Sequence, residues 1–352
     1  MRAIGSGSDD RSPSFEVDAV VAWVDGADPT HLVKRSKVLG QGIDFDALTI
    51  PAGVDPTRFE NNNEIEYCLR SIRRFAPWVR TIHLVTDQQC PGFLTEAERA
   101  RLGVSLVDHQ VIFRGYEEAL PTFNSLSIES VLHRIPGIAS RYLYLNDDFI
   151  LMSPTTPSDF FWKDAVVLRG EWCRLKDYGQ VRLLASRLLN RLLKRFFGIN
   201  RAMSALQQMR GAELGGAKGS FFKVGHSPYP IKRETLEAFF LSNERVLRKN
   251  IAYKFRNLNQ FAVTALANQI EISQGHARLR SPGDCLMICF NRDSQSQIDR
   301  KIERLASGKV RFACIQSLEE AGREQRDRLL AVVEEALQDG MTETGAARGA
   351  LG

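Results

Sequence analysis

The stretch Val17–Pro29, which reads VDAVVAWVDGADP, decides the fold class of this 352-residue chain. Residues 17–24 form an apolar run, which is the pattern of a strand buried in a sheet. The run stops at residues 25–29, DGADP, whose Gly, Asp and Pro residues are a strong turn signal. Because parallel sheets bind ligands beyond the carboxyl ends of their strands, Asp25 lies where a ligand site is expected.

Strands alternate with helices from this first strand to about residue 170. A helix is predicted at residues 63–75, with a capping asparagine before it, a proline after it, and one apolar face made of Ile65, Leu69, Ile72 and Phe75. Further strands are predicted at 81–86, 104–107 and 141–145, and an amphipathic helix at 125–135. This order predicts an α/β fold, a mostly parallel sheet with helices on both faces.

The chain after residue 172 has mainly helical patterns. Helices are predicted at about residues 182–197, 232–240, 257–268, 296–306 and 319–337. Residues 1–14 and 339–352 are small and polar and are expected to be disordered tails. We therefore expect one domain over residues 15–338, with a helical insertion at about 175–215 and a helical C-terminal part.

The predicted helix Arg182–Phe197 carries a basic stripe made of Arg187, Arg191 and Arg195. Such a stripe can dock on an anionic surface, including the inner face of a membrane, or bind a glycan phosphate. It can equally be the solvated side of a helix packed on the core. The sequence leaves both interpretations open, and likewise the formation of a homo-oligomer.

The composition is that of an ordinary globular protein, with 43% hydrophobic and 25% charged residues. A net charge of +5 is too small to indicate a nucleic-acid partner, although it suits ligands that carry phosphate. The N-terminus lacks the apolar core of a signal peptide, and no apolar run is long enough to span a bilayer. A cytoplasmic location is therefore expected, with peripheral membrane contact left open.

The six cysteines contain no CxxC pair. Cys285 and Cys289 lie four residues apart, but no second pair of Cys or His residues completes a zinc site. Reduced and mostly buried thiols are therefore expected. Sequence signatures of P-loop, dinucleotide-binding, serine-hydrolase and HExxH metalloprotease chemistry are absent.

Two acidic motifs are candidates for binding a divalent cation. Asp147 and Asp148 follow the apolar strand sequence YLYL, which would fix them at the edge of the sheet. Hard carboxylate oxygens bind Mg²⁺ or Mn²⁺, which neutralises a diphosphate, although adjacent carboxylates are also common in solvated turns. Asp44 and Asp46 form a rival DxD motif, but no strand precedes it.

Two further residues have side chains suited to phosphate chemistry. His226 lies in the proline-rigidified sequence GHSPYP and could accept the proton of an attacking hydroxyl. Arg256 heads a predicted helix, and its guanidinium could bind phosphate with two parallel hydrogen bonds. Taken alone, each has an ordinary alternative, a structural histidine and a surface arginine.

Together these motifs resemble the Stealth family of sugar-1-phosphate transferases, which includes enzymes of bacterial capsule and exopolysaccharide synthesis and the animal enzyme that makes the mannose-6-phosphate tag. The resemblance rests on four blocks between about residues 17 and 295. They are DAVVAWVDGADP from Asp18, the long block from Arg58 that ends with LPTFNSLSIESVLHRIPGIASRYLYLNDD, GHSPYP with KFRNLNQFAV, and Cys289-Phe290-Asn291.

The resemblance implies a modified glycosyltransferase-A-like sheet that holds a nucleotide-sugar and a metal ion, Mg²⁺ or Mn²⁺. By resemblance, Asp147, Asp148, His226 and Arg256 match the catalytic positions. The metal would bind Asp148 and Asp293. The positions expected to bind substrate are Trp23, Asp25, Gly26, Asp28, Arg58, Asn62, Arg70, Asn124, Ser125 and Asn291.

The fourth block departs from the family pattern. The family has Asn-Asp at this point, whereas here Arg292 follows Asn291 and the aspartate, Asp293, comes one residue later. Two interpretations stay open: Asp293 takes over through a small shift of the chain, or Arg292 changes how the phosphate is held.

The function that the resemblance implies is transfer of a hexose-1-phosphate, such as GlcNAc-1-phosphate, from a UDP-sugar to a hydroxyl of an acceptor glycan. A phosphodiester forms and UMP is released. The alternatives are a conventional glycosyltransferase, which breaks the anomeric bond and releases UDP, and a non-catalytic protein that binds glycan or phosphate.

Overall fold

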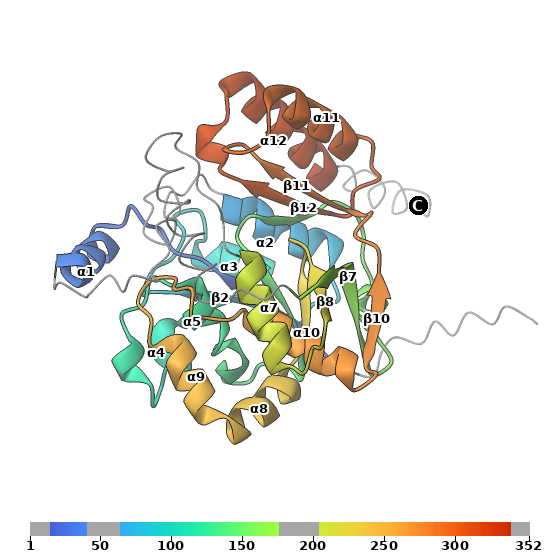
Figure 1. Ribbon diagram of the computed structural model, residues 1–352. Coiled ribbons are helices and arrows are strands. Elements are labelled where there is room, and N and C mark those ends of the chain that lie inside the picture. The colour runs from blue at the N-terminus through green and yellow to red at the C-terminus, as the bar shows by residue number, and fades with distance from the viewer. Residues whose placement is uncertain (1–14, 41–63, 176–203, 339–352) are drawn as a thin grey trace, which may run out of the picture.

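The computed structural model describes residues 15–40, 64–175 and 204–338 (Figure 1). Several predicted features lie outside these residues: both tails, the DxD motif at Asp44–Asp46, the asparagine cap before residue 64, and the basic helix Arg182–Phe197. Among the residues that the structure describes, no helix combines the length and the apolar character needed to cross a membrane.

The central sheet contains five strands in the order β3-β2-β1-β4-β9. Their bounds are Val104–Asp108 for β3, Ile82–Thr86 for β2, Val17–Ala22 for β1, Arg141–Asn146 for β4 and Tyr229–Lys232 for β9. The first four strands run parallel, and β9 is antiparallel to β4. The four strands predicted from the apolar runs are therefore confirmed, with ends shifted by no more than two residues.

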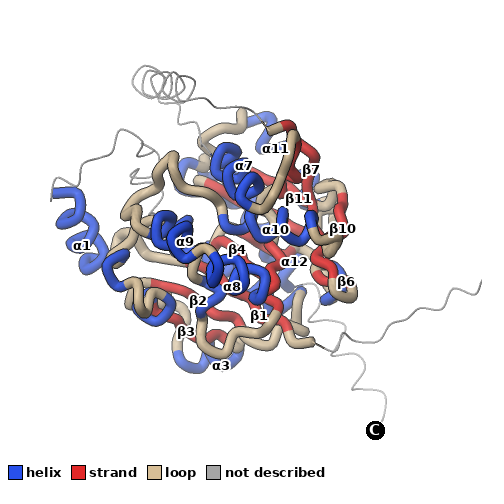
Figure 2. The backbone as a smooth tube through the Cα atoms, turned by 60° about the horizontal axis from the view of Figure 1, so that its bottom comes forward, coloured by secondary structure: helices blue, strands red, loops and turns tan. Residues whose placement is uncertain are grey.

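Helices cover both faces of the central sheet, as predicted. One face packs against α2 (Glu64–Phe75), whose residues Ile65, Leu69 and Ile72 join a core cluster with Val17, Ala19 and Val21 of β1. The other face carries Val20, Tyr142 and Tyr144, which pack against helices on the opposite side. The helices on this side are α5 (Ser125–Glu129), α8 (Arg233–Ser242), α9 (Glu244–Ile251) and α10 (Val263–Ser273). Figure 2 shows α8 and α9 in front of the sheet.

A second, three-stranded sheet lies in the C-terminal part, in the order β11-β12-β5. Its strands are Cys285–Cys289, Phe312–Gln316 and Phe149–Leu151, and its helices are α11 (Gln295–Ala306) and α12 (Arg323–Gln338). The two helices lie together at one end of the molecule in Figure 1. The predicted helical C-terminal part is thus confirmed. Because only two residues separate the end of β4 from the start of β5, the turn between them joins the two sheets.

A third group of strands leads toward the histidine loop. It contains β6 (Phe161–Trp162), β7 (Ala165–Arg174), β8 (Ser220–Val224) and β10 (Ala277–Arg280). The remaining helices are α1 (Pro29–Gly40), α3 (Glu96–Leu102), α4 (His109–Ile112) and α7 (Ser204–Leu214), with short 3-10 turns at 117–119, 132–134, 157–159 and 318–320.

Three predicted helices differ in extent from those observed. The helix predicted at 125–135 ends at Glu129 and resumes as a 3-10 turn at 132–134. Nevertheless Ile128, Val131, Leu132 and Ile135 are all buried as predicted. The Ser130 hydroxyl donates to Leu126 O at 2.7 Å, a side-chain bond that competes with continuation of the helix. The helix predicted at 319–337 begins only at Arg323, after a 3-10 turn.

The helix predicted at 257–268 begins only at Val263, as α10. Buried side chains take the backbone hydrogen bonds of the preceding segment. Asn257 N donates to Gln260 Oε1 at 2.9 Å, and Phe261 N donates to Asn250 Oδ1 at 3.0 Å. Arg256 consequently lies in a loop rather than at the head of a helix, which corrects the sequence-based prediction.

A buried carboxylate, Asp18, ties the first strands of the central sheet together. Its side chain is fully buried and accepts hydrogen bonds from Arg80 at 2.9 and 2.7 Å and from the backbone N–H of Ala139 at 2.8 Å. His83 Nε2 lies 3.0 Å from the same carboxylate. Burial alone would raise the pKa of Asp18, but the hydrogen bonds from His83, Arg80 and Ala139 hold it well below its usual value.

We expect Asp18→Asn to lower the free energy of unfolding by about 3 kcal/mol, because it leaves Arg80 without its buried partner. The pKa of Asp18 is depressed, so this contribution is present above its unfolded value and is lost as the pH falls. Urea denaturation at pH 7 measures the loss. Glu16→Gln is the matched control, since Glu16 pairs with the same arginine but is 68% exposed. Equal losses in both variants would contradict the role of Asp18.

Candidate active site

The adjacent carboxylates Asp147 and Asp148 form the turn between β4 and β5. The backbone of this turn is fixed, because Ile315 N of β12 donates to Asp148 O at 2.9 Å. Cys314 Sγ donates to Asp148 Oδ2 at 3.4 Å, whereas Asp148 Oδ1 is buried without a hydrogen-bond partner among the described residues. One carboxylate oxygen is thus held and the other is available to a ligand.

The environment of this pair favours protonation in the absence of a cation. The pKa of Asp147 is raised to about 8, mainly by burial and further by the negative charges of Asp148 and Glu64. Burial also raises the pKa of Asp148 to about 6, although hydrogen bonds from Gln316 and Cys314 oppose the rise. Two desolvated carboxyl groups side by side are unfavourable when both are ionised, and a bound cation would relieve that cost.

His226 lies in the loop between β8 and β9, as predicted. Its ring meets the ring of Phe149, the residue after Asp148, edge-on at 6.2 Å. Burial lowers the pKa of His226, and the positive charges of Arg292, Lys223 and Arg256 lower it further. Its Nδ1 is buried and has no hydrogen-bond partner among the described residues. A neutral imidazole in this position can accept a proton at neutral pH.

Arg256 lies in the loop between α9 and α10. Its Nη2 donates to the hydroxyl of Ser125 at 2.5 Å, so the structure brings these two predicted residues together. Burial lowers the pKa of Arg256, while the charges of Glu129, Tyr144 and Asp148 oppose the lowering. The charge of Arg256 also lowers the pKa of His226, but no hydrogen bond or ion pair joins Asp148, His226 and Arg256 to one another among the described residues.

A buried amide network holds the Arg256 loop in place. Asn124 is fully buried, and its Nδ2 donates to Tyr253 O at 3.0 Å and to Gln260 Oε1 at 2.8 Å. Its Oδ1 accepts from Leu126 N, which caps α5. Gln260 in turn donates to Asn250 O at 2.7 Å. The observed contacts of Asn124 position the loop, and its expected contact with substrate stays a prediction.

The predicted residues after β1 lie at the same edge of the sheet as the carboxylate pair, because Ala22 is in register with Asn146. Here Asp25 Oδ1 accepts from Ala27 N at 2.9 Å, and Asp28 Oδ1 accepts from His31 N at 2.8 Å at the start of α1. Gly26 is buried within this turn. Trp23 is 5% exposed and belongs to the core, so its observed contacts are packing contacts.

Other predicted residues have protein partners. Arg70 donates to both carboxylate oxygens of Glu334, at 2.8 and 2.9 Å, and thereby joins α2 to α12. Asn291 donates to Ser317 Oγ at 2.7 Å and accepts from Cys289 Sγ. Their roles toward substrate stay predictions. Arg58 and Asn62 lie outside the described residues.

The two residues of the departing fourth block have different surroundings. Asp293 accepts from Lys301 Nζ at 2.5 Å and from Cys289 N at 2.8 Å. Burial alone would raise the pKa of Asp293, but these partners hold it below its usual value. Arg292 has a 62% exposed side chain, and its charge acts on His226. Asp293 is therefore engaged by Lys301 of α11 and by the backbone of its own loop. Within the described part of the chain, Arg292 is largely exposed and makes only a 3.9 Å ion pair with Asp293 and a 3.7 Å contact with Met287 Sδ.

The sequence analysis missed residues that surround Arg256. The Tyr144 hydroxyl donates to Asn146 Oδ1 at 2.7 Å and lies 3.2 Å from Glu129 Oε1. The sequence held two signals for them. Tyr144 and Asn146 are two residues apart on one strand, so they share a face, and Glu129 is one helical turn after Ser125.

The six cysteines are all free thiols, as predicted, but only three of the six are buried, so the expectation that most of them are buried was wrong. Across residues 15–40, 64–175 and 204–338, no group of three or more His, Cys, Asp or Glu side chains is arranged to hold a metal ion. Mg²⁺ is nevertheless usually held by one or two carboxylates together with the phosphates of a substrate. The unpartnered oxygen of Asp148 and the raised pKa values of the pair fit such a cation.

A family model described as Stealth protein CR2, conserved region 2, matches residues 58–168. The chain is 30% identical over 321 residues to a receptor polysaccharide phosphotransferase of Streptococcus oralis, covering 85% of this chain and 90% of that protein. It is 28% identical over 350 residues to a capsular polysaccharide phosphotransferase of Streptococcus pneumoniae, covering 93% of this chain and 98% of that protein.

An exopolysaccharide phosphotransferase of Streptomyces coelicolor is 36% identical over 236 residues, covering 64% of this chain but 22% of that protein. The matched region spans 22–26% of the length of three relatives in that organism and 44% of a fourth. Among solved structures, a galactosyltransferase bound to donor and acceptor sugar analogues is similar over 90% of this chain and 95% of its own, with a TM-score of 0.38 and 10% identity. This remote similarity concerns the fold alone.

We expect Asp147→Asn to stabilise the metal-free protein at alkaline pH. The folded pKa of Asp147 is raised, so the folded state retains a proton that the unfolded chain loses, and stability falls as the pH rises from about 4 to about 8. The asparagine variant lacks this loss. Calorimetry in chelator across this range should show a shallower decline in Tm for the variant. Asp327→Asn, at an exposed carboxylate, is the control and should parallel the unsubstituted protein. Parallel curves for Asp147→Asn would refute a raised pKa.

Proposed function

Because this chain belongs to the Stealth family, we propose that it transfers a hexose-1-phosphate, such as GlcNAc-1-phosphate, from a UDP-sugar to a hydroxyl of an acceptor glycan. The names of the relatives, polysaccharide phosphotransferases, support this class of reaction. The structural observation that supports it most directly is the carboxylate pair at the carboxyl end of β4, where Asp148 Oδ1 has no hydrogen-bond partner among the described residues and the ring of His226 meets that of the adjacent Phe149.

The proposed reaction is a displacement at phosphorus. The acceptor oxygen bonds to the β-phosphorus of the UDP-sugar, the bond from that phosphorus to the bridging oxygen breaks, and UMP leaves with the bridging oxygen. The bond at the anomeric carbon remains intact, so a sugar–phosphate–sugar diester results. Such a reaction depends on positioning and on charge neutralisation more than on covalent catalysis.

The residues of the site can supply these two requirements. His226, neutral because burial lowers its pKa, accepts the proton of the acceptor hydroxyl. Arg256, anchored by Ser125, donates two hydrogen bonds to the phosphate that is transferred. A divalent cation, Mg²⁺ or Mn²⁺, held by Asp147 and Asp148 would supply further neutralisation of the diphosphate. Asp293 pairs with Lys301 and is a weaker candidate for a metal ligand.

The nucleotide product distinguishes the proposed reaction from its alternatives. We expect incubation with a panel of UDP-sugars and acceptor glycans to release UMP, and excess chelator or Asp148→Asn to abolish release with the fold intact. Chromatography of the nucleotides measures it. UDP as the product would support a conventional glycosyltransferase, and binding without turnover would support a non-catalytic protein. Full activity in chelator would refute the metal site.

Substitutions of His226 and of Arg256 should have different effects on kcat and on donor affinity. His226→Ala should lower kcat by about 10²–10⁴-fold with little change in donor affinity, because a general base is lost. In the unsubstituted protein, kcat should fall at acidic pH as His226 is protonated, with a midpoint below the usual histidine pKa. This fall in kcat should be absent from His226→Ala. Arg256→Lys keeps the charge but loses the paired donors, so most activity and some donor affinity should be lost.

Two exposed residues provide matched controls for these variants, measured by the same steady-state kinetics and donor titrations. His276→Ala and Arg101→Lys make the same substitutions outside the site and should leave both quantities unchanged. Near-normal turnover in His226→Ala would assign the base to another group, with Asp147 next to be tested. A silent Arg256→Lys would make this residue a structural arginine only.

A further inference from the structure

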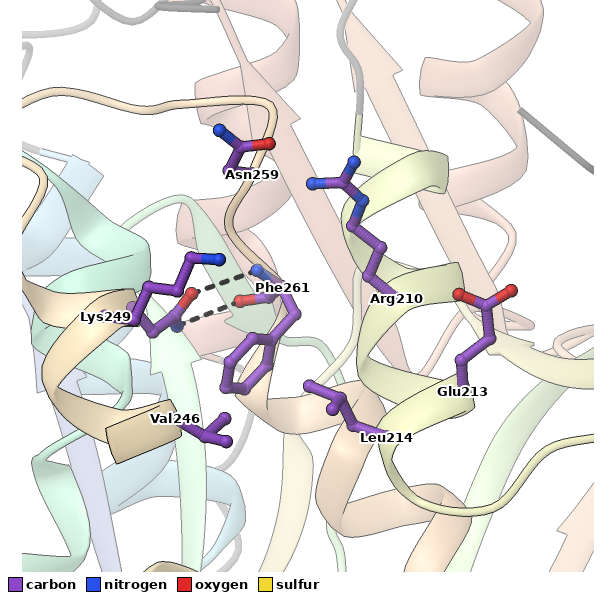
Figure 3. Close-up of a pocket in the computed structure, with 8 residues that line it drawn as sticks. Arg210, Glu213, Leu214, Val246, Lys249, Asn259 and Phe261 are labelled. Atoms are coloured by element: carbon purple, nitrogen blue, oxygen red, sulfur yellow. Dashed lines mark hydrogen bonds between the residues drawn. The ribbon is translucent and has the colours of Figure 1, made fainter. Parts of the chain in front are cut away.

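A pocket of about 520 Å³ lies beside the Arg256 loop, between helices α7 and α9. Figure 3 shows Arg210 and Leu214 on α7 forming one wall, and Val246 and Lys249 on α9 forming the opposite wall. Residues of the loop between α9 and α10 lie between these walls. The pocket is separate from the carboxylate pair and from His226, and the proposed reaction does not use it.

The polar groups of this pocket are mostly unengaged. Lys249 and Glu213 are exposed, and within the described part of the chain neither makes an ion pair. Arg210 donates one hydrogen bond to Leu258 O, and the side chain of Asn259 lies at the mouth opposite the guanidinium. The lining residues thus include two cations, one carboxylate and one amide, with a formal charge of +1, and Figure 3 shows the Glu213 carboxylate on the side of α7 away from α9. This set offers both donors and acceptors and prefers an anionic ligand.

The remaining lining is apolar, and the backbone of one of its residues, Phe261, is held by hydrogen bonds. Val246, Leu214 and Phe261 contribute apolar surface. The side chain of Asn250 binds both backbone groups of Phe261, accepting from its N–H at 3.0 Å and donating to its carbonyl at 3.2 Å (Figure 3). An apolar lining with a few fixed polar groups is the usual make-up of a small-ligand site. A sugar ring, with apolar C–H faces and hydroxyl edges, matches it.

The loop connects this pocket directly to the proposed phosphate-binding residue. Asn259 lies three residues from Arg256, so their Cα atoms are at most about 10 Å apart. Resting on the proposed function, we propose that the pocket binds an acidic sugar unit of the acceptor glycan, a uronate or a phosphorylated sugar, while a neighbouring unit presents its hydroxyl to the site. The charge at the pocket then selects the acceptor and does not take part in the reaction.

Two single substitutions test this proposal, because they should change the affinity for acidic glycans in opposite directions. The probe is an array of bacterial oligosaccharides with acidic and neutral members, incubated with the labelled full-length protein at low ionic strength and without donor. Lys249→Gln should weaken binding to acidic members by about two- to fivefold, the size expected for one exposed charge. Glu213→Gln should strengthen the same binding by a similar factor. Both residues are exposed, so neither change threatens the fold.

Lys218→Gln and Lys309→Gln remove the same charge from exposed positions outside the pocket and should leave binding unchanged. Absence of binding to acidic members, or equal effects of pocket and control substitutions, would overturn the proposal. The outcome is independent of turnover. If the protein binds acidic glycans in this way but releases no UMP, the result supports the proposed pocket and contradicts the proposed function. Release of UMP with binding indifferent to both pocket substitutions would reject the pocket alone.

Discussion

The desolvated pair Asp147–Asp148 is the constraint on which the arrangement of the site depends. The pair is half-buried in the turn of two residues that joins β4 of the central sheet to β5 of the C-terminal sheet. Partial removal from water raises the pKa values of both carboxyl groups, so the pair is unfavourable when both are ionised. The cost of ionising the pair falls if positive charge is near, and the charges of Asp148 and Arg256 attract each other. The turn that joins the two sheets therefore also carries the two carboxylates of the proposed site.

The central sheet could be predicted from sequence because its signals are local. Strand β4 and the apolar face of α2 each depend on residues close together in the chain, and both were found within two residues of their ends. The start of α10 could not be found in this way. Its position depends on Gln260 and Asn250, which take backbone hydrogen bonds of the preceding loop through contacts that no periodicity records.

The membership of the site stays a prediction, and the contacts of its predicted members could not be read from the motifs. The motifs identified Asp148, His226 and Arg256 as one group. In the structure the charge of Arg256 lowers the pKa of His226, and the charge of Asp148 opposes the lowering of the pKa of Arg256. The partners of Arg70 and Asp293 were invisible, because Glu334 is 264 residues from Arg70 and the Lys301 contact depends on how α11 begins. Such pairings arise from tertiary packing, and sequence motifs give only the residue types that take part.

The Arg256 loop links the two ends of the proposed acceptor path, and its rigidity has a physical source. Asn124, Gln260 and Asn250 are buried, and their amides bind one another and the loop backbone. A buried amide network is stable only when its donors and acceptors are paired, so it admits few alternative arrangements. The same network sets the guanidinium of Arg256 against Ser125 and sets Phe261 in the wall of the pocket. Movement at one end of the loop would therefore disturb the other, which favours a single fixed spacing between the phosphate and the acceptor sugar.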